Sequence, residues 1–241
     1  AQQGAVLGPQ HDVFQDGEHL LDQLDLQLRR GEIAVLLGSN GVGKTTLLNL
    51  LAGVLAPNSG QVALNGYDVH TTPLARKNLG YLPDRPPLYD ELSVLQQLEF
   101  AASIFGLAAD QRDAQIHAAT ERWQLSERLS QATGTLSKGW RQRCGLAQAT
   151  IHNPAFLLLD EPGEGLDPTQ LLHMRAALRG ITENGTGILL STHLLEEARQ
   201  LADRILILKN GSIQHEIIGE EINDPGKLEA LISDDKAVDT A

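Results

Sequence analysis

The chain has little of several things that would point to particular classes of protein. Cys144 is the only cysteine among 241 residues, so no disulfide can form within one chain, and we expect a reducing compartment. Lysine and arginine together number 19 against 31 acidic residues, which gives a formal net charge of −12. Because binding to a nucleic-acid backbone needs a basic surface, we expect no nucleic-acid partner, and direct docking on anionic lipid is disfavoured for the same reason.

Long apolar runs are also missing. No stretch approaches the roughly 20 apolar residues that span a bilayer, and no signal-peptide pattern is visible. If a membrane is involved, we therefore expect another chain to supply it. The first residue is not methionine, so we expect that the N-terminus has been trimmed or replaced.

Apolar runs of strand length alternate with helical segments along most of the chain. Four runs are continuously apolar, as expected of strands buried on both faces: 33–37, 156–159, 187–190 and 205–208. This alternation predicts an α/β fold with a parallel sheet. Residues 5–28 resemble edge strands, and Asn65-Gly66 and Asn210-Gly211 each predict a hairpin turn.

One stretch differs from the rest in character. Residues 92–131 are rich in helix-forming residues and poor in β-branched ones, which predicts an inserted helical subdomain, with bounds of about 88–150. We expect the main domain to cover residues 1–218 and residues 219–241 to form a loose acidic tail.

A glycine-rich octet follows the first continuous apolar run. It reads Gly-Ser-Asn-Gly-Val-Gly-Lys-Thr and matches the phosphate-loop pattern between a buried strand and a helix. The glycines let backbone N–H groups converge on phosphate oxygens, and the helix N-terminus adds its dipole. Lys44 would reach the β- and γ-phosphates, and Thr45 would ligate Mg²⁺. The expected nucleotide-binding residues are Gly38, Ser39, Asn40, Gly41, Val42, Gly43, Lys44, Thr45 and Thr46.

A second apolar run, 156–159, ends in two carboxylates. Asp160 is expected to hold Mg²⁺ through water, as the second acid of a phosphate-loop ATPase does. Glu161 follows directly and is placed to polarise an attacking water. Such an ending alone is common in solvated turns, but after a phosphate loop it predicts ATP hydrolysis.

Further motifs resemble those of the ATP-binding cassette (ABC) family. Leu-Ser-Lys-Gly-Trp-Arg-Gln-Arg at 136–143 is similar to the ABC signature Leu-Ser-Gly-Gly-Gln-x-Gln-Arg, and its Ser137 lies 23 residues before Asp160. Asp167 is similar to the D-loop aspartate, and His193 to the switch histidine after a strand. Asp84 stands in the place of the Q-loop. These motifs occur in the family's order, and the resemblance covers residues 5–218.

Several positions depart from the usual ABC pattern. Asp84 replaces the Q-loop glutamine, although a carboxylate can also bind Mg²⁺. Lys138 and Trp140 replace a glycine and a glutamine of the signature, and Gly163-Glu164 stands where Thr-Ser is frequent. The pattern Leu-Ser-Lys-Gly-aromatic is similar to that of ABC-2-type exporter ATPases. The family's adenine-stacking aromatic should lie about two dozen residues before Gly38, and Phe14 is the candidate for it.

The resemblance implies a fold and a mechanism. The fold is a phosphate-loop NTPase core of ABC type with an antiparallel β-subdomain and the inserted helical subdomain. The cofactors are ATP and Mg²⁺, and Glu161 and His193 are the expected catalytic residues. Two cassettes, in a homodimer or a mixed pair, would bind head to tail, with each ATP between one chain's Lys44 and the other's signature residues Ser137, Lys138, Gly139 and Trp140.

The implied biological role is transport. We expect the chain to power a separate transmembrane permease, most similar to an exporter, from the cytoplasmic face of the membrane, with residues 85–89 as the docking surface. The competing hypotheses are a soluble ABC ATPase outside transport and a scaffold that does not hydrolyse ATP. In the monomer, we expect the turn at Trp140 to be largely exposed; the alternative is that this indole folds back on its own helical subdomain.

Overall fold

A computed structural model describes residues 4–7, 13–15, 18–21, 24–224, 226, 228 and 230–231, with side chains from Leu21 onward. Its centre is a six-stranded sheet in the order β12-β11-β5-β10-β9-β8. The first strand is antiparallel to its neighbour and the other five are parallel. The strands are β5 (Ile33–Leu37), β8 (Leu79–Leu82), β9 (Phe156–Asp160), β10 (Gly187–Thr192), β11 (Arg204–Lys209) and β12 (Ser212–Ile218).

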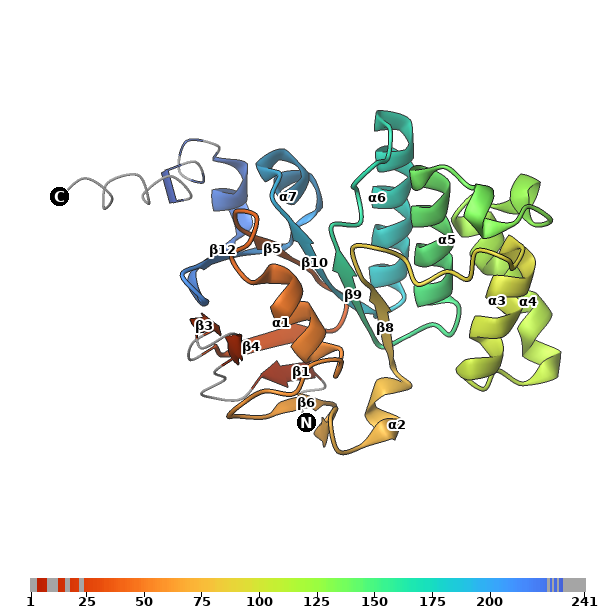
Figure 1. Ribbon diagram of the computed structural model, residues 1–241. Coiled ribbons are helices and arrows are strands. Elements are labelled where there is room, and N and C mark those ends of the chain that lie inside the picture. The colour runs from red at the N-terminus through yellow and green to blue at the C-terminus, as the bar shows by residue number, and fades with distance from the viewer. Residues whose placement is uncertain are drawn as a thin grey trace.

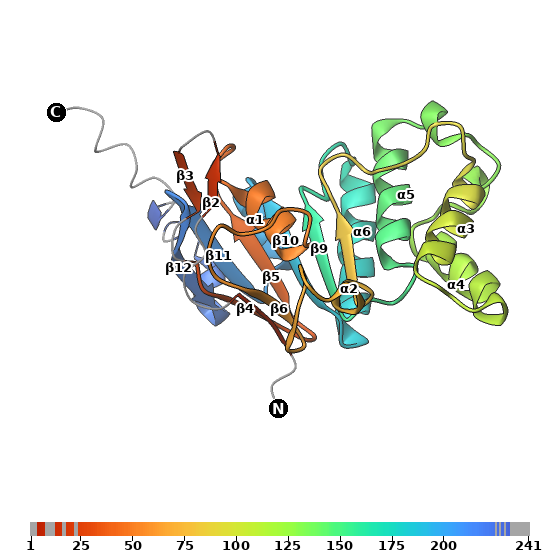
Figure 2. The same ribbon diagram turned by 60° about the horizontal axis from the view of Figure 1, so that its bottom comes forward.

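The apolar runs of the sequence form the middle of this sheet. Every residue of β5, β9 and β10 is buried, which explains why these strands read as continuous rather than alternating apolar runs. Helices cover the sheet on both faces, as Figures 1 and 2 show. They are α1 (Lys44–Leu51), α6 (Pro168–Glu183) and α7 (Leu195–Leu201). The predicted α/β fold with a parallel sheet is confirmed.

A second, smaller sheet is antiparallel and is formed by strands from the first third of the chain. Its order is β4-β1-β6-β7, and β2 and β3 form a separate hairpin. Asn65 and Gly66 join β6 to β7 with positive φ angles of 51° and 83°, and Asn210 and Gly211 join β11 to β12 in the same way. Both predicted hairpins are therefore confirmed. The remaining elements here are β1 (Gly4–Leu7), β2 (Val13–Gln15), β3 (Glu18–Leu21), β4 (Leu26–Arg29), β6 (Val62–Leu64), β7 (Tyr67–Asp68) and α2 (Pro73–Arg76).

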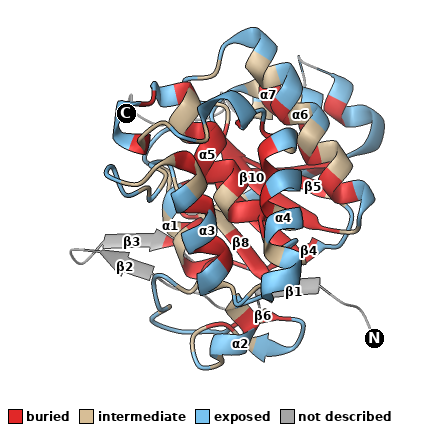
Figure 3. Ribbon diagram, turned by 90° about the vertical axis from the view of Figure 1, so that its right-hand side faces the viewer, coloured by how far each residue is buried: buried red, intermediate tan, exposed pale blue. Residues whose placement is uncertain are grey.

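A helical unit lies between β8 and β9 in the chain and at one side of the molecule in Figure 2. It comprises α3 (Val94–Ile104), α4 (Ala109–Arg122), α5 (Lys138–Thr150) and 3-10 turns at Ser126–Arg128 and Thr133–Thr135. Ser93 and Gln96 form a capping box at the start of α3. The helices bury Leu98, Trp123 and Leu125 against the main core, and Figure 3 shows the buried residues running from the sheet into this unit.

The expectation of a loose tail after residue 218 is wrong for the part of it that the structure describes. Gly219–Asn223 forms a 3-10 helix, and the side chains of Ile222 and Leu228 are buried in the main core. Each apolar side chain removed from water in this way contributes on the order of 2 kcal/mol, which holds this part of the segment against the domain.

His152 joins the helical unit to the sheet and gives the fold a pH dependence. Its ring stacks on Phe105 at 3.5 Å between centroids, Nε2 contacts the Leu79 carbonyl at 3.2 Å, and Nδ1 is buried without a partner. Burial lowers the pKa of His152 from 6.5 to about 4, because a proton on Nδ1 would have no acceptor.

In the unfolded chain, His152 is therefore protonated near pH 6.5, whereas in the folded chain it is protonated only near pH 4. The stability that His152 provides is present above pH 6.5 and is lost as the pH falls toward 4. We expect the free energy of unfolding of the native chain to drop by about 2 kcal/mol more than that of a His152→Gln variant between pH 7 and pH 5. Urea unfolding at both pH values measures this; equal drops in the two proteins would contradict it.

Candidate nucleotide site

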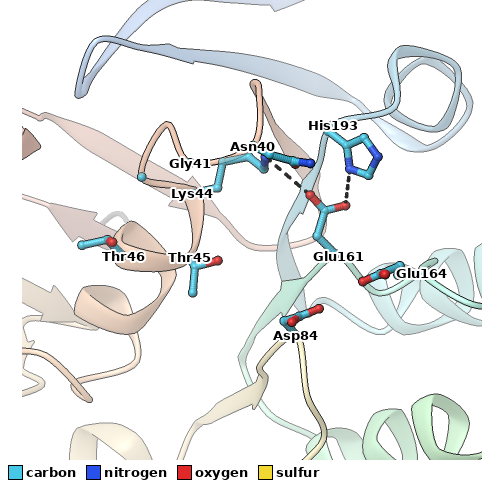
Figure 4. A pocket seen from close by; sticks show the side chains of 10 residues that line it. Asn40, Gly41, Lys44, Thr45, Thr46, Asp84, Glu161, Glu164 and His193 are labelled. Atoms are coloured by element: carbon cyan, nitrogen blue, oxygen red, sulfur yellow. Dashed lines mark hydrogen bonds and ion pairs between the residues drawn. The ribbon is translucent and has the colours of Figure 1, made fainter. Parts of the chain in front are cut away.

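The residues expected to bind nucleotide come together at one edge of the sheet. β5, β10, β9 and β8 are neighbours and parallel, and their register aligns Leu37 with Thr192 and Ser191 with Asp160. Segments that follow these strands therefore meet at the carboxyl edge, where parallel α/β sheets bind ligands. They line a cavity of about 410 Å³ formed by Asn40, Gly41, Gly43, Lys44, Thr45, Thr46, Asp84, Glu161, Glu164 and His193 (Figure 4).

The phosphate loop turns from β5 into α1 over one edge of this cavity. Gly41 and Gly43 have φ angles of 82° and 105°, a conformation that favours glycine. Gly38 is needed for another reason, because a Cβ there would lie 2.8 Å from the Leu208 carbonyl oxygen. The loop and the N-terminus of α1 thus present the backbone to the cavity, as a phosphate site requires.

The Lys44 ammonium sits in the curve of this loop. It is 6% exposed and donates to the carbonyls of Gly38 at 2.9 Å and Ser39 at 3.1 Å. Glu161 Oε1 lies 3.5 Å from Nζ. A buried cation that is only partly neutralised attracts a phosphate group entering the cavity.

Asp160 lies beneath the loop and is fully buried. Its Oδ2 accepts a hydrogen bond from Thr45 Oγ1 at 2.7 Å, and its Oδ1 accepts one from Ser191 Oγ at 2.6 Å. A hydroxyl beside a carboxylate at the foot of a phosphate loop is an oxygen donor set that suits Mg²⁺. Among the described residues, no group of three or more His, Cys, Asp or Glu side chains is placed to hold a metal by itself.

Glu161 faces the cavity from the turn after β9. Its φ of 46° is rare for a residue with a side chain, and such conformations concentrate at functional sites. Its backbone N–H donates to Ser191 Oγ at 3.0 Å. Its Oε2 lies 3.1 Å from Nδ1 of His193, a contact drawn as a dashed line in Figure 4. The structure therefore brings together Lys44, Glu161 and His193, which are far apart in the sequence.

The carboxyl groups of Asp84 and Glu164 lie next to each other in the lining of the same cavity. Burial and the Glu164 carboxylate raise the pKa of Asp84, whereas the hydrogen bond from Lys138 lowers the pKa of Glu164. Lys138 Nζ donates to Glu164 Oε1 at 2.6 Å. The three positions that depart from the usual ABC pattern, 84, 138 and 164, are thus in contact with one another. Their contacts could not be predicted from the sequence, because the residues are far apart in it.

The signature residues do not line this cavity. They begin α5, where Ser137 is the N-cap residue and its hydroxyl caps no backbone N–H. Ser137 and Lys138 are exposed, but Gly139 is buried and Trp140 is half-buried. The expectation of a largely exposed turn is therefore wrong at Gly139 and Trp140. The Arg143 guanidinium lies 3.6 Å from the centroid of the Trp140 ring, and the Arg128 guanidinium lies 5.0 Å from it. The indole packs against its own helical unit, as the alternative expectation had it.

Two further predicted residues lie elsewhere. Asp167 is the N-cap residue of α6, and its side chain accepts a hydrogen bond from the Gln170 N–H at 2.9 Å. It lines a separate cavity together with Trp140. Phe14 lies in β2, but its side chain is outside the described residues, so its contact with adenine stays a prediction.

Sequence reasoning missed residues that hold the site from behind. Gln142 is 2% exposed, and its Nε2 donates to the Pro162 carbonyl at 3.2 Å, which ties the signature helix to the turn that carries Glu161. Ser191 links Asp160 to the Glu161 backbone. The polar triplet after a buried strand, Ser-Thr-His at 191–193, was the available signal for Ser191.

Fold and site together define a phosphate-loop protein with a helical insertion between β8, which is followed by Asp84, and β9, which ends at Asp160. A profile of the family described as ABC transporter matches residues 21–164. The chain belongs to this family and contains its ATP-binding domain.

Similar proteins support this placement. The chain is 37% identical over 203 residues to an uncharacterized ABC transporter ATP-binding protein, YdbJ of Bacillus subtilis, covering 83% of this chain and 65% of that protein. It is 37% identical to the daunorubicin resistance ATP-binding protein DrrA3 of Streptomyces coeruleorubidus, covering 84% of this chain and 64% of the relative. The chain thus spans less than two thirds of these relatives. A solved ATP-binding subunit of an ABC transporter superposes with a TM-score of 0.85 at 28% identity, covering 96% of this chain and 95% of the other.

Proposed function

We propose that the chain hydrolyses ATP as the nucleotide-binding subunit of an ABC transporter, in a head-to-tail pair of cassettes. One observation carries the proposal: a buried lysine, a threonine–aspartate pair and a glutamate–histidine pair converge on one cavity at the carboxyl edge of the sheet. These are the groups that phosphoryl transfer to water needs, namely a phosphate cradle, oxygen ligands and a group that orients the nucleophile.

Each group has a distinct task. Backbone N–H groups of the phosphate loop and Lys44 hold the β- and γ-phosphates, and Glu161 orients the attacking water and accepts its proton. His193 positions the Glu161 carboxylate through the contact to Oε2. Thr45 and Asp160 would hold Mg²⁺, with Asp84 as a further candidate ligand, and that ion would neutralise charge on the phosphates.

The second half of the site comes from the partner in this proposal. Ser137, Lys138, Gly139 and Trp140 lie outside the cavity that holds Lys44, so one chain alone does not supply both surfaces. The N-terminus of the 13-residue helix α5, with the free Ser137 hydroxyl and the Lys138 ammonium, suits a γ-phosphate presented by another copy. A homodimer or a pair with a related cassette satisfies this equally.

A substitution at Ser137 tests the shared site with less disturbance of the monomer than one at Gly139. A Cβ at the buried Gly139 would lie 2.8 Å from Gln170 Oε1 and 3.2 Å from the Gly165 carbonyl, so a substitution there disturbs the monomer, whereas Ser137 is exposed. In a Glu161→Gln background, Ser137→Asp should leave ATP affinity within about twofold but abolish ATP-dependent dimers, because a carboxylate would face a phosphate.

Titration with fluorescent ATP and light scattering measure the two effects separately. Ser103→Asp puts the same charge on the exposed surface of α3 and should leave both unchanged. A Ser137→Asp chain that dimerises normally with ATP would remove the signature from the partner's site.

We further propose that the pair drives a separate transmembrane permease, of exporter type, from the cytoplasmic face of the membrane. Among the described residues, no helix is both long and apolar enough to cross a bilayer. The names of relatives refer to resistance to a drug and to multidrug transport. The exposed side chains of Tyr89, Phe100 and Ile104 form an apolar surface on the helical unit that fits a protein partner, in agreement with residues 85–89 as the docking segment. Co-purification with a multi-span membrane protein tests this against a soluble ATPase.

Asp84→Gln introduces the residue more usual at this position in the family. It removes a carboxyl whose pKa is raised by burial and by its neighbour Glu164, so the local repulsion falls while an oxygen ligand remains. We expect the ATPase rate to stay within about tenfold of the native rate, a barrier change of roughly 1.4 kcal/mol or less. A loss of more than a hundredfold in a steady-state assay would show a specific catalytic role for Asp84.

A further inference from the structure

Glu197 is a buried carboxyl group behind the catalytic turn. It lies on α7 and is 5% exposed. Its Oε2 accepts a hydrogen bond from Thr192 Oγ1 at 2.5 Å, whereas its Oε1 is buried without a hydrogen-bond partner. A half-satisfied buried carboxyl costs free energy that an apolar residue would not, so its presence needs a reason other than stability.

Gly163 provides the space for this carboxyl. A Cβ added at Gly163 would overlap Glu197 Oε1, and it would lie 2.9 Å from Leu171 Cδ2 and 3.2 Å from Glu197 Cδ. The φ angle of Gly163 is not among the positive ones, so the requirement for glycine here is one of space rather than of backbone conformation. A side chain at position 163 would therefore displace Glu197, its nearest neighbour, and would also press on the end of Leu171.

The two contacts of Glu197 reach both halves of the Glu161–His193 pair. Thr192 precedes His193, and its Oγ1 also accepts the backbone N–H of Leu194 at 3.1 Å, so the residues on either side of His193 are tied to the Glu197 carboxyl. Gly163 lies two residues after Glu161 in the same turn. The His193 side chain is 40% exposed, so its position depends on how firmly its backbone is held.

We propose that Glu197 is a positioning residue for ATP hydrolysis, which sets the Glu161–His193 contact by bracing the turn at Gly163 and the segment Thr192–Leu194. The proposal rests on the catalytic roles proposed above for Glu161 and His193. Glu197 acts through these neighbours, and a displacement of about 1 Å in a catalytic group can lower a rate up to a hundredfold. Burial, followed by the Glu161 charge, raises the pKa of Glu197. Glutamine has the same length and an oxygen that can accept the Thr192 hydroxyl, so we expect it to replace Glu197.

The test compares variants of the full chain in a steady-state Mg-ATPase assay. Glu197→Ala should lower kcat at least about tenfold with the KM for ATP within about twofold, since the phosphate loop is untouched. Glu197→Gln should keep kcat within about threefold, because its amide oxygen can accept the Thr192 hydroxyl. Gly163→Ala should lower kcat like Glu197→Ala. The Gly163→Ala/Glu197→Ala double variant should be no slower than Glu197→Ala, because the shorter side chain removes the nearest overlap and the other is with the flexible end of Leu171.

Matched controls separate positioning from general destabilisation. Glu196 is exposed on the same helix, and a Cβ at Gly180 in α6 meets nothing within 4 Å, so alanine at either position should leave kcat within about twofold. If Glu197→Ala does not fold, Gly163→Ala is the variant that tests the proposal.

Three results would overturn the proposal. They are a native kcat in Glu197→Ala or Gly163→Ala, losses in kcat that multiply in the double variant, and equal losses in kcat for Glu197→Ala and Glu197→Gln. Glu161→Gln in the same assay separates the two hypotheses: if it keeps native turnover, the catalytic assignment itself fails, whatever Glu197 does.

Discussion

Glu161→Gln is expected to lower ATP hydrolysis at least about a hundredfold while ATP still binds. The carboxylate lies 3.5 Å from Lys44 Nζ and 3.1 Å from His193 Nδ1, so both of its oxygens are held at the cavity. An amide of the same shape cannot accept the proton of the attacking water, and a hundredfold loss corresponds to about 2.7 kcal/mol of barrier. Asp160 and Thr45 keep their mutual contact, so the site for the nucleotide should remain.

Phosphate release and ATP titration measure the two properties independently. Glu164→Gln is the matched control, because Glu164 lines the same cavity but pairs with Lys138. We expect that control to stay within about tenfold of the native rate. Phosphate release at the native rate from Glu161→Gln would exclude Glu161 as the group that activates water.

Lys44→Ala should weaken ATP binding by about a hundredfold or more. Its ammonium is the buried cation of the cavity, and it is held in the curve of the phosphate loop by two backbone carbonyls. Charge-assisted contacts to phosphate in a site shielded from water are among the strongest polar interactions, and alanine removes them without filling the space.

Equilibrium titration with fluorescent ATP measures this loss, and thermal denaturation checks that the variant is folded. Lys77→Ala removes an exposed lysine of the same domain and should not change the affinity. Native ATP affinity in the Lys44→Ala chain would place the phosphates elsewhere in the cavity.

Much of the fold could be predicted because its signals are local. The continuous apolar runs give the buried strands, and Asn65-Gly66 adopts the two positive φ angles that a tight hairpin turn demands. The order of motifs along the chain was enough to group Lys44, Asp160, Glu161 and His193, since parallel strands place all their carboxyl ends at one edge.

What the sequence could not reveal depends on contacts between distant residues. Gly163 and Glu197 are separated by 34 positions, and no local pattern shows that one supplies room for the other. The same holds for Trp140, whose two arginine neighbours were not predicted. Ile222 and Leu228 are scattered apolar residues in an acidic stretch, and only the shape of the core shows that they are buried.

The proposed mechanism requires that two cassettes share each ATP. The most direct measurement is the mass of the Glu161→Gln chain in solution by light scattering, with and without Mg-ATP, because blocked hydrolysis preserves the nucleotide between the subunits. Without nucleotide the chain should scatter as a monomer of 26.1 kDa, and with saturating Mg-ATP its mass should double. A monomer mass at ATP concentrations where titration shows the site to be full would contradict the shared site.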